Sequence, residues 1–322
     1  MLGISVSTVS RALRDAYDVN PETRKKVLEL TEKLNFKLNK NASALASGST
    51  KNIGVVIPFI TNYYFSTVIS GIQEEAYNQG YNIILYLTND DIQREKKLIE
   101  NIATSSLDGL LISISSDSTN IDHFETLIKE DFPKVFFDRV PKDIKASKVL
   151  QSDFDGAYQA TNYLINKGYS KIAHIAGPEE LVFTQERLRG YKQSLAEAKL
   201  AYREDYVVFS GFTQVDGYAD TARLLSLKEP PNAIFAVNDR KAVGAIQALK
   251  KAGIKVGKEA GVIGFTNDPI ATVIEPNLTT IEEPAFEIGL QSCKLLIRHI
   301  KNKAFEAHEI LIPGRLIERE SV

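Results

Sequence analysis

From residue 52 onward, short apolar runs alternate with amphipathic segments, a pattern typical of strands joined by helices. The runs predicted as strands are 53–57, 82–87, 109–114, 135–138, 172–176, 206–209, 233–237 and 262–265. The predicted helices are 65–79, 93–105, 121–129, 156–167, 184–199, 215–225 and 240–251. This order predicts an α/β fold with parallel sheets. A pause around residues 141–152 favours two doubly wound lobes, although periodicity alone also fits a barrel.

The first residues predict a small helical head. Ser5 can cap a helix that places Val9 and Leu13 on one face. Asn20 and Pro21 are a strong start signal for a second helix. The outward positions of the first helix carry Val6, Ser7, Ser10 and Arg11. Such side chains suit a recognition helix in a major groove, although an ordinary surface helix has the same pattern.

A segment rich in Ala, Ser and Asn follows at residues 39–50, with Leu45 as its one large apolar side chain. A helix this short is unstable alone in water and orders only when it packs against a partner. Leu45 is therefore either incidental or a wedge that inserts between base steps in the minor groove.

Charge is distributed unevenly. Residues 1–52 hold nine Lys or Arg against five acids, a net charge of +4, whereas the remainder carries −6. A basic head favours attraction to a phosphate backbone, although it also fits a solvated surface. The single cysteine, the missing signal-peptide pattern and the lack of a run of about 20 apolar residues predict a cytoplasmic protein without membrane contact.

Motifs for catalysis are missing from the sequence. No G-x-G-x-x-G follows a predicted strand, the four histidines are scattered, and the acidic pair Asp153 and Asp155 is explained by helix N-caps. We therefore predict no enzyme, no catalytic residue, no metal site and no cofactor.

Loops at the carboxyl ends of parallel strands are where such sheets bind ligands. Aromatic faces can cover a sugar or base ring, while planar polar groups fix hydroxyls or ring nitrogens. The alternative for Phe65 and Phe212 is a core position, and for Arg187 an exposed pair with Glu186. The residues predicted to line an effector cleft are Tyr64, Phe65, Arg187, Phe212, Asn238 and Asp268.

Several motifs, in order along nearly the whole chain, resemble the LacI/GalR family of bacterial transcription regulators. They lie at residues 6–13, 23–27 with Phe36, 41–50, 53–58, 108–109, 187–191, 238–239, 264–265, 278–281 and 316–321. The resemblance implies a helix-turn-helix head, a hinge helix and a two-lobed, periplasmic-binding-protein-like core that binds an effector. It also implies a homodimer on a pseudo-palindromic double-stranded operator, with Val6, Ser7 and Arg11 contacting bases and Leu45 as the wedge.

The family's three crossings between lobes imply the domain boundaries. These are 1–38 for the head, 39–52 for the hinge, 53–152 plus 283–312 for the N-terminal lobe, and 153–282 plus 313–322 for the C-terminal lobe.

The chain departs from the family pattern in four places. Family heads have one more helix, of which about the last residue is present here, so we expect a partly unfolded head and either an upstream start or lost autonomous DNA binding. The hinge has Leu38, Ser43 and Ala46 in place of a proline and basic residues. At two positions where family members have a cleft aspartate, this chain has Thr266 and Gln151. Asp268, two residues after Thr266, is a possible substitute there.

The leading hypothesis is a DNA-binding transcriptional regulator, which the resemblance implies to be a repressor. It is controlled by a small polar effector, for which a sugar is the first expectation and a nucleobase the second. The alternatives are a solute-binding receptor and a truncated effector-binding dimer without DNA activity.

Overall fold

A computed structural model describes residues 2–13, 16–34, 49–102, 104–118, 120, 122–142, 144–302 and 304–322. The chain divides into two compact units, Met1–Thr50 and Lys51–Val322. Leu45 and residues 39–48 of the predicted hinge lie outside the described residues.

The described residues of the first unit form two helices, α1 (Val6–Leu13) and α2 (Pro21–Lys33). Ser5 caps α1 as predicted, because its hydroxyl accepts the backbone N–H of Thr8 at 3.1 Å. Asn20 caps α2, which has a proline in its first turn. Val9 and Leu13 pack against a small core whose buried members are Ala12, Val19 and Val27.

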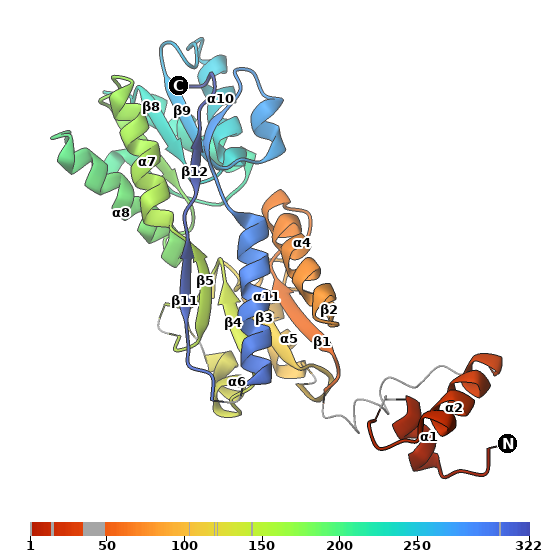
Figure 1. Cartoon of the computed structure of the whole chain (residues 1–322). Helices are drawn as coiled ribbons and strands as arrows, with labels where there is room; N and C mark the ends of the chain where they lie inside the picture. Colours follow the sequence, from red (N-terminus) through yellow and green to blue (C-terminus); the bar gives the residue numbers. More distant parts are fainter. Residues whose placement is uncertain are drawn as a thin grey trace. The chain divides into compact units, whose positions relative to one another are not determined.

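The second unit is built on two six-stranded sheets, which confirms the predicted two-lobed α/β fold (Figure 1). One sheet has the order β11-β5-β4-β3-β1-β2 and is parallel throughout. The other has the order β12-β10-β9-β8-β6-β7, in which only β12 is antiparallel to its neighbour. The strands are β1 (Asn52–Ile57), β2 (Asn82–Leu87), β3 (Gly109–Ile112), β4 (Lys134–Phe137), β5 (Ser147–Gln151), β6 (Ile172–Ala176), β7 (Val207–Phe209), β8 (Ala233–Ala236), β9 (Gly261–Thr266), β10 (Thr279–Glu282), β11 (Glu309–Ile312) and β12 (Arg315–Ile317).

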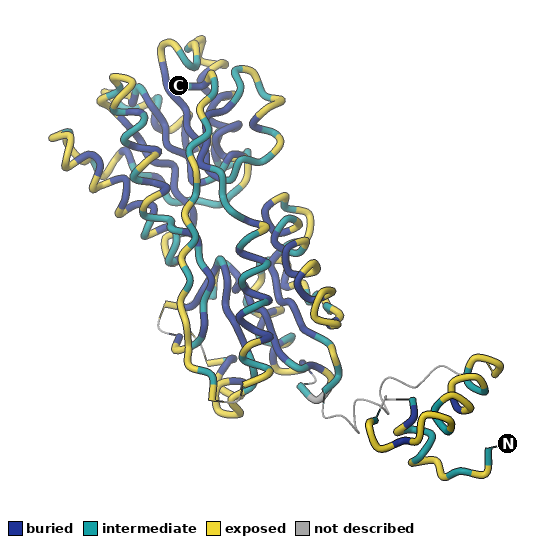
Figure 2. Tube along the Cα trace, viewed as in Figure 1, coloured by how far each residue is buried: buried dark blue, intermediate teal, exposed yellow. Residues whose placement is uncertain are grey.

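Helices cover both faces of each sheet, so the central strands are buried while the outer helix faces are exposed (Figure 2). In the first lobe α4 and α11 pack together on one face. In the second lobe α7 packs with α8, and α9 packs with α10. The α-helices of this unit are α4 (Tyr63–Asn78), α5 (Ile92–Asn101), α6 (Glu125–Lys129), α7 (Asp153–Asn166), α8 (Val182–Glu197), α9 (Gln214–Leu225), α10 (Asp239–Lys251) and α11 (Ala285–Lys301).

Three short segments connect the lobes. Ser152 lies between β5 of the first sheet and α7 of the second lobe. Residues 283–284 lead from β10 back to α11, and residues 313–314 lead from β11 to β12. Each connection is only one or two residues long.

Two sequence-based predictions about this region were wrong or incomplete. The segment 141–152, predicted to be a break between the lobes, contains strand β5. Its sequence, SKVLQ, alternates between buried and half-buried positions and includes polar residues, so it was not recognised as a strand. Four regular elements after residue 278 were not predicted: β10, α11, β11 and β12.

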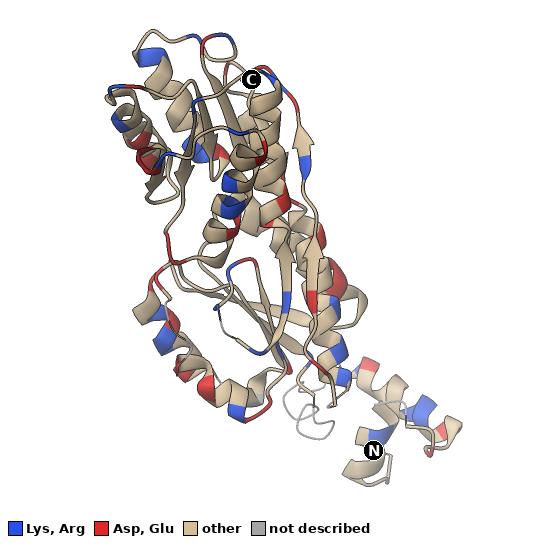
Figure 3. Ribbon diagram, turned by 90° about the vertical axis from the view of Figure 1, so that its left-hand side faces the viewer, with Lys and Arg blue, Asp and Glu red and all other residues tan. Residues whose placement is uncertain are grey.

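Within the described part of the chain, none of the helices combines the length and apolar character needed to cross a membrane. Acidic and basic residues are interspersed along the helices of both lobes (Figure 3).

The contact between α4 and α11 depends on two glycines. A Cβ at Gly71 would lie 2.0 Å from the carbonyl oxygen of Phe286, and a Cβ at Gly289 would lie 2.0 Å from that of Val68. We expect Gly71→Ala to lower the free energy of unfolding by about 1–3 kcal/mol, because the helices must separate. Urea denaturation measures this loss. Ser70→Ala, at the exposed neighbouring position, is the control, and an equal effect of both changes would contradict the close-packing argument.

Candidate functional site

The outward face of α1 carries the four residues predicted to contact bases. Val6 is 86% exposed, Ser7 and Arg11 are exposed, and Ser10 is half-buried. Arg11 forms an ion pair with Asp18, and both side chains remain accessible. Because such surface pairs contribute little to stability, Arg11 can exchange this partner for a phosphate or a base at small cost.

A cavity of about 580 Å³ lies at the carboxyl ends of both sheets. All six residues predicted to line the effector cleft contribute to its wall: Tyr64, Phe65, Arg187, Phe212, Asn238 and Asp268. The strand-end loops bring them together, as expected for doubly wound sheets. Their role as effector ligands remains a prediction.

Aromatic side chains form much of this wall. Tyr64 and Phe65, in the first turn of α4, contact each other edge to face with centroids 5.4 Å apart. On the other lobe, Phe183 and Phe212 stack with centroids 6.0 Å apart and an interplanar angle of 25°. With Phe59, the cavity has five aromatic rings, enough to cover a ring-shaped ligand from both lobes.

Arg187 is buried under the cavity and most of its donors have protein partners. Its Nε donates to Asp153 at 2.8 Å, one terminal nitrogen donates to the Val237 carbonyl at 2.6 Å, and the other donates to Glu283 at 2.6 Å. The guanidinium also lies 3.6 Å from the ring centroid of Phe265. Burial lowers the pKa of Arg187, but the two carboxylates outweigh it and the pKa is raised.

Asp138 follows β4 and lines the cavity. It accepts a hydrogen bond from Ser113 at 3.3 Å and another from the Tyr64 hydroxyl. Burial raises the pKa of Asp138 to about 6, although Arg139 acts in the opposite direction. Burial and the same carboxylate raise the pKa of Tyr64, so its hydroxyl stays protonated and is a donor.

Arg139 connects the cavity wall to the loops that follow β2 and β3. Its guanidinium donates to Asp90 at 2.6 Å and lies 5.0 Å from the ring centroid of Phe212, which belongs to the other lobe. Asp90 in turn accepts the backbone N–H of Ser116 at 2.8 Å. The arginine is therefore held in place without a ligand.

Two of the predicted cleft residues form hydrogen bonds that cap helices. Asn238 caps α10 by accepting the backbone N–H of Lys241 at 2.8 Å, and its amide donates to the Phe212 carbonyl at 3.1 Å. Asp268 caps a short 3-10 helix by accepting the backbone N–H of Ile270 at 3.0 Å. Both shape the wall as much as they offer groups to a ligand.

Two interpretations drawn from the sequence were wrong. Asp153 and Asp155 are not N-caps, since Ser152 occupies that position of α7 and Asp153 pairs with Arg187. Arg187 is not an exposed partner of Glu186, because Arg189 takes that role.

The structure adds wall residues that the sequence-based set lacked: Asp138, Arg139, Phe183, Arg240 and Glu283. The first two had a sequence signal, since Asp138 ends a predicted strand and Arg139 directly follows it. Glu283 had none, because β10 before it was not predicted. Among the described residues, no group of three or more His, Cys, Asp or Glu is arranged to hold a metal ion.

The raised pKa of Asp138 predicts a pH-dependent stability. A carboxyl with a raised folded-state pKa contributes stability that is complete below its unfolded pKa, near 4, and is lost as pH rises through about 6. We expect Asp138→Asn to match the unchanged protein at pH 4 and to exceed its unfolding free energy by about 1–2 kcal/mol at pH 8, allowing for partial solvent access.

Urea denaturation at several pH values measures this difference. Asp205→Asn is the control, because Arg203 lowers the pKa of Asp205 and neutralisation there should act in the opposite direction. A pH-independent difference for Asp138→Asn would contradict the buried-carboxylate argument.

Comparison with known proteins agrees with this architecture. Residues 2–39 match the family model "Bacterial regulatory proteins, lacI family", and residues 161–322 match a periplasmic binding protein-like domain. The HTH-type transcriptional repressor PurR of Vibrio parahaemolyticus serotype O3:K6 (strain RIMD 2210633) is 32% identical over 100% of this chain and 96% of its own.

Two solved structures are similar in fold. The transcriptional regulator CelR in complex with cellobiose has a TM-score of 0.80 and 26% identity, covering 100% of this chain and 97% of its own. A LacI family regulator from Enterococcus faecium with bound ribose has a TM-score of 0.72 and 30% identity, and the match covers 84% of this chain and 98% of its own. These relatives are regulators and not enzymes. The chain belongs to the lacI family of bacterial regulatory proteins and is a DNA-binding transcriptional regulator.

Proposed function

We propose that this regulator is a repressor whose affinity for an operator is set by an uncharged sugar bound between its lobes. The cavity carries the proposal, because five aromatic rings and a few fixed polar groups surround a space of about 580 Å³. Such a site fits a ligand with apolar ring faces and several hydroxyls.

The charges of the cavity favour a neutral effector over an anionic one. The guanidinium of Arg187 is taken up by Asp153 and Glu283, and that of Arg139 binds Asp90. Asp138 remains as an acceptor for hydroxyl groups. Among the wall arginines, Arg240 is accessible and lies 3.9 Å from Asp268, so an anionic group would meet several carboxylates and one accessible cation. Cellobiose and ribose, the ligands named for the two similar structures, are both uncharged.

The basic head supports operator binding through α1, with Val6, Ser7, Ser10 and Arg11 at the bases. We propose a homodimer, because a second copy of the head doubles the contacted half-sites and matches a pseudo-palindromic operator. A regulator that acts on DNA is expected in the cytoplasm. Effector binding then changes lobe closure, and the coupling free energy between the two sites is typically about 1–3 kcal/mol.

Arg11→Ala should weaken binding to DNA selected from a random pool by about 1–3 kcal/mol, because a base-edge contact is lost. Fluorescence anisotropy at several salt concentrations measures affinity and salt slope. Arg203→Ala is the charge-matched control on the second lobe, where Arg203 pairs with Asp205 and Glu229. Equal losses in both variants would assign the effect to net charge and remove α1 from the interface.

Cellobiose or ribose should raise the thermal unfolding midpoint, since a ligand at 100 times its Kd stabilises by about 2.7 kcal/mol. Phe212→Ala should reduce this shift because one ring face of the cavity is lost. Tyr202→Ala, which removes an aromatic ring outside the cavity, should leave the shift unchanged.

Glucose 6-phosphate is the charged comparator in the same measurement. A shift with the phosphate and none with any neutral sugar would overturn the proposed effector class.

A further inference from the structure

Lys241 is a fully buried lysine in the first turn of α10, beneath the cavity wall of the second lobe. Burial lowers the pKa of its ammonium, and Asp220 acts in the opposite direction. The nearby His174 is neutral, because burial lowers its pKa to about 3. A buried ammonium is costly unless every donor has a partner.

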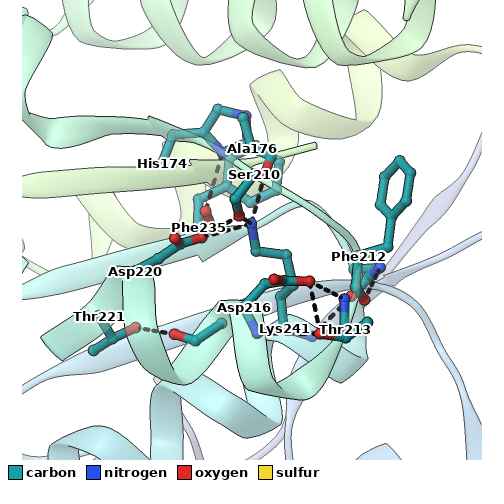
Figure 4. A network of polar contacts seen from close by, with 12 residues as sticks. His174, Ala176, Ser210, Phe212, Thr213, Asp216, Asp220, Thr221, Phe235 and Lys241 are labelled. Atoms are coloured by element: carbon teal, nitrogen blue, oxygen red, sulfur yellow. Dashed lines mark hydrogen bonds and ion pairs between the residues drawn. The ribbon is translucent and has the colours of Figure 1, made fainter. Parts of the chain in front are cut away.

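All three ammonium donors have partners (Figure 4). Nζ donates to the Ala176 carbonyl at 2.6 Å, to the Ser210 hydroxyl at 2.7 Å and to Asp220 at 2.7 Å. Ser210 also donates to Asp220 at 2.7 Å. One side chain on α10 therefore joins the end of β6, the loop after β7 and helix α9.

Both loops held by Lys241 determine where Phe212 lies. Ser210 is two residues before Phe212 on the same loop. Ala176 precedes Gly177, on which the ring of Phe212 rests: a Cβ at Gly177 would lie 2.6 Å from a ring carbon of Phe212. Asn238 binds the Phe212 carbonyl, and its own side chain accepts the backbone N–H of Lys241.

Stability alone does not account for a buried ion pair between Lys241 and Asp220. Replacing a buried ion pair by apolar residues of similar volume is often neutral or stabilising. An apolar side chain at 241 could fill the space, but it could not bind a carbonyl on one cavity loop and a hydroxyl on the other.

We propose that Lys241 is a positioning residue of the effector cavity, whose ammonium fixes the loops 176–177 and 210–213 so that the Phe212 ring faces the cavity in one orientation. The role in effector recognition rests on the proposed function. The positioning itself does not, and it can be measured without an effector.

The chain has no tryptophan, so Phe212→Trp provides a single reporter at this position. In the full chain carrying this reporter, Lys241→Met with Asp220→Asn removes the ion pair without leaving a buried charge. We expect a red-shifted emission and about twofold stronger acrylamide quenching.

Thr221→Val is the matched structural control, because it removes a buried hydrogen bond from Thr221 to the Gly217 carbonyl within α9 and touches neither loop. If quenching rises equally in this variant, or stays unchanged in the double variant, Lys241 has no positioning role. Should the double variant fail to fold, Ser210→Ala keeps the ion pair and cuts one loop contact. Increased quenching there supports the proposal, and unchanged quenching overturns it.

The effector measurement is separate. If no neutral sugar shifts the unfolding midpoint of the unaltered chain, the proposed function fails, whereas the tryptophan comparison still decides the role of Lys241.

Discussion

The ion pairs of Arg187 join segments that lie far apart in the sequence. Asp153 stands just after the first connection between the lobes, Glu283 lies within the second, and the Val237 carbonyl marks the end of β8. Removing the guanidinium would leave two carboxylates buried without a counter-charge, which typically costs about 3–5 kcal/mol. The cavity floor and the two connections therefore depend on one side chain.

Much of the fold could be predicted from the sequence because parallel strands buried on both faces give continuous apolar runs. Where this condition fails, so did the prediction: Lys148 and Gln151 interrupt β5, and the edge strand β11 is only partly buried. Some cavity residues near recognised strand ends, such as Asn238, were found, whereas Asp138 and Arg139 were missed. Glu283 was missed with its strand, and the partners of Arg187 depend on tertiary contacts that spacing along the chain does not encode.

The chemistry of the cavity follows from how its charges are used. Two of the wall arginines, Arg139 and Arg187, are held by carboxylates of the protein, and the amide of Asn238 supports a helix and a loop. Aromatic surface, the acceptor oxygens of Asp138 and the accessible guanidinium of Arg240 remain for a ligand. Selectivity in such a site comes from shape and hydrogen bonding more than from net charge.

The short connections between the lobes restrict how the lobes can move. Ser152 spans one crossing, and two residues span each of the others, so each link reaches at most about 7 Å beyond regular structure. Three such links prevent the lobes from separating or sliding far, but small dihedral changes in them allow rotation about a common axis. A ligand in the cavity can therefore change the angle between the two lobes, and the ends of the lobes farthest from the connections then move most.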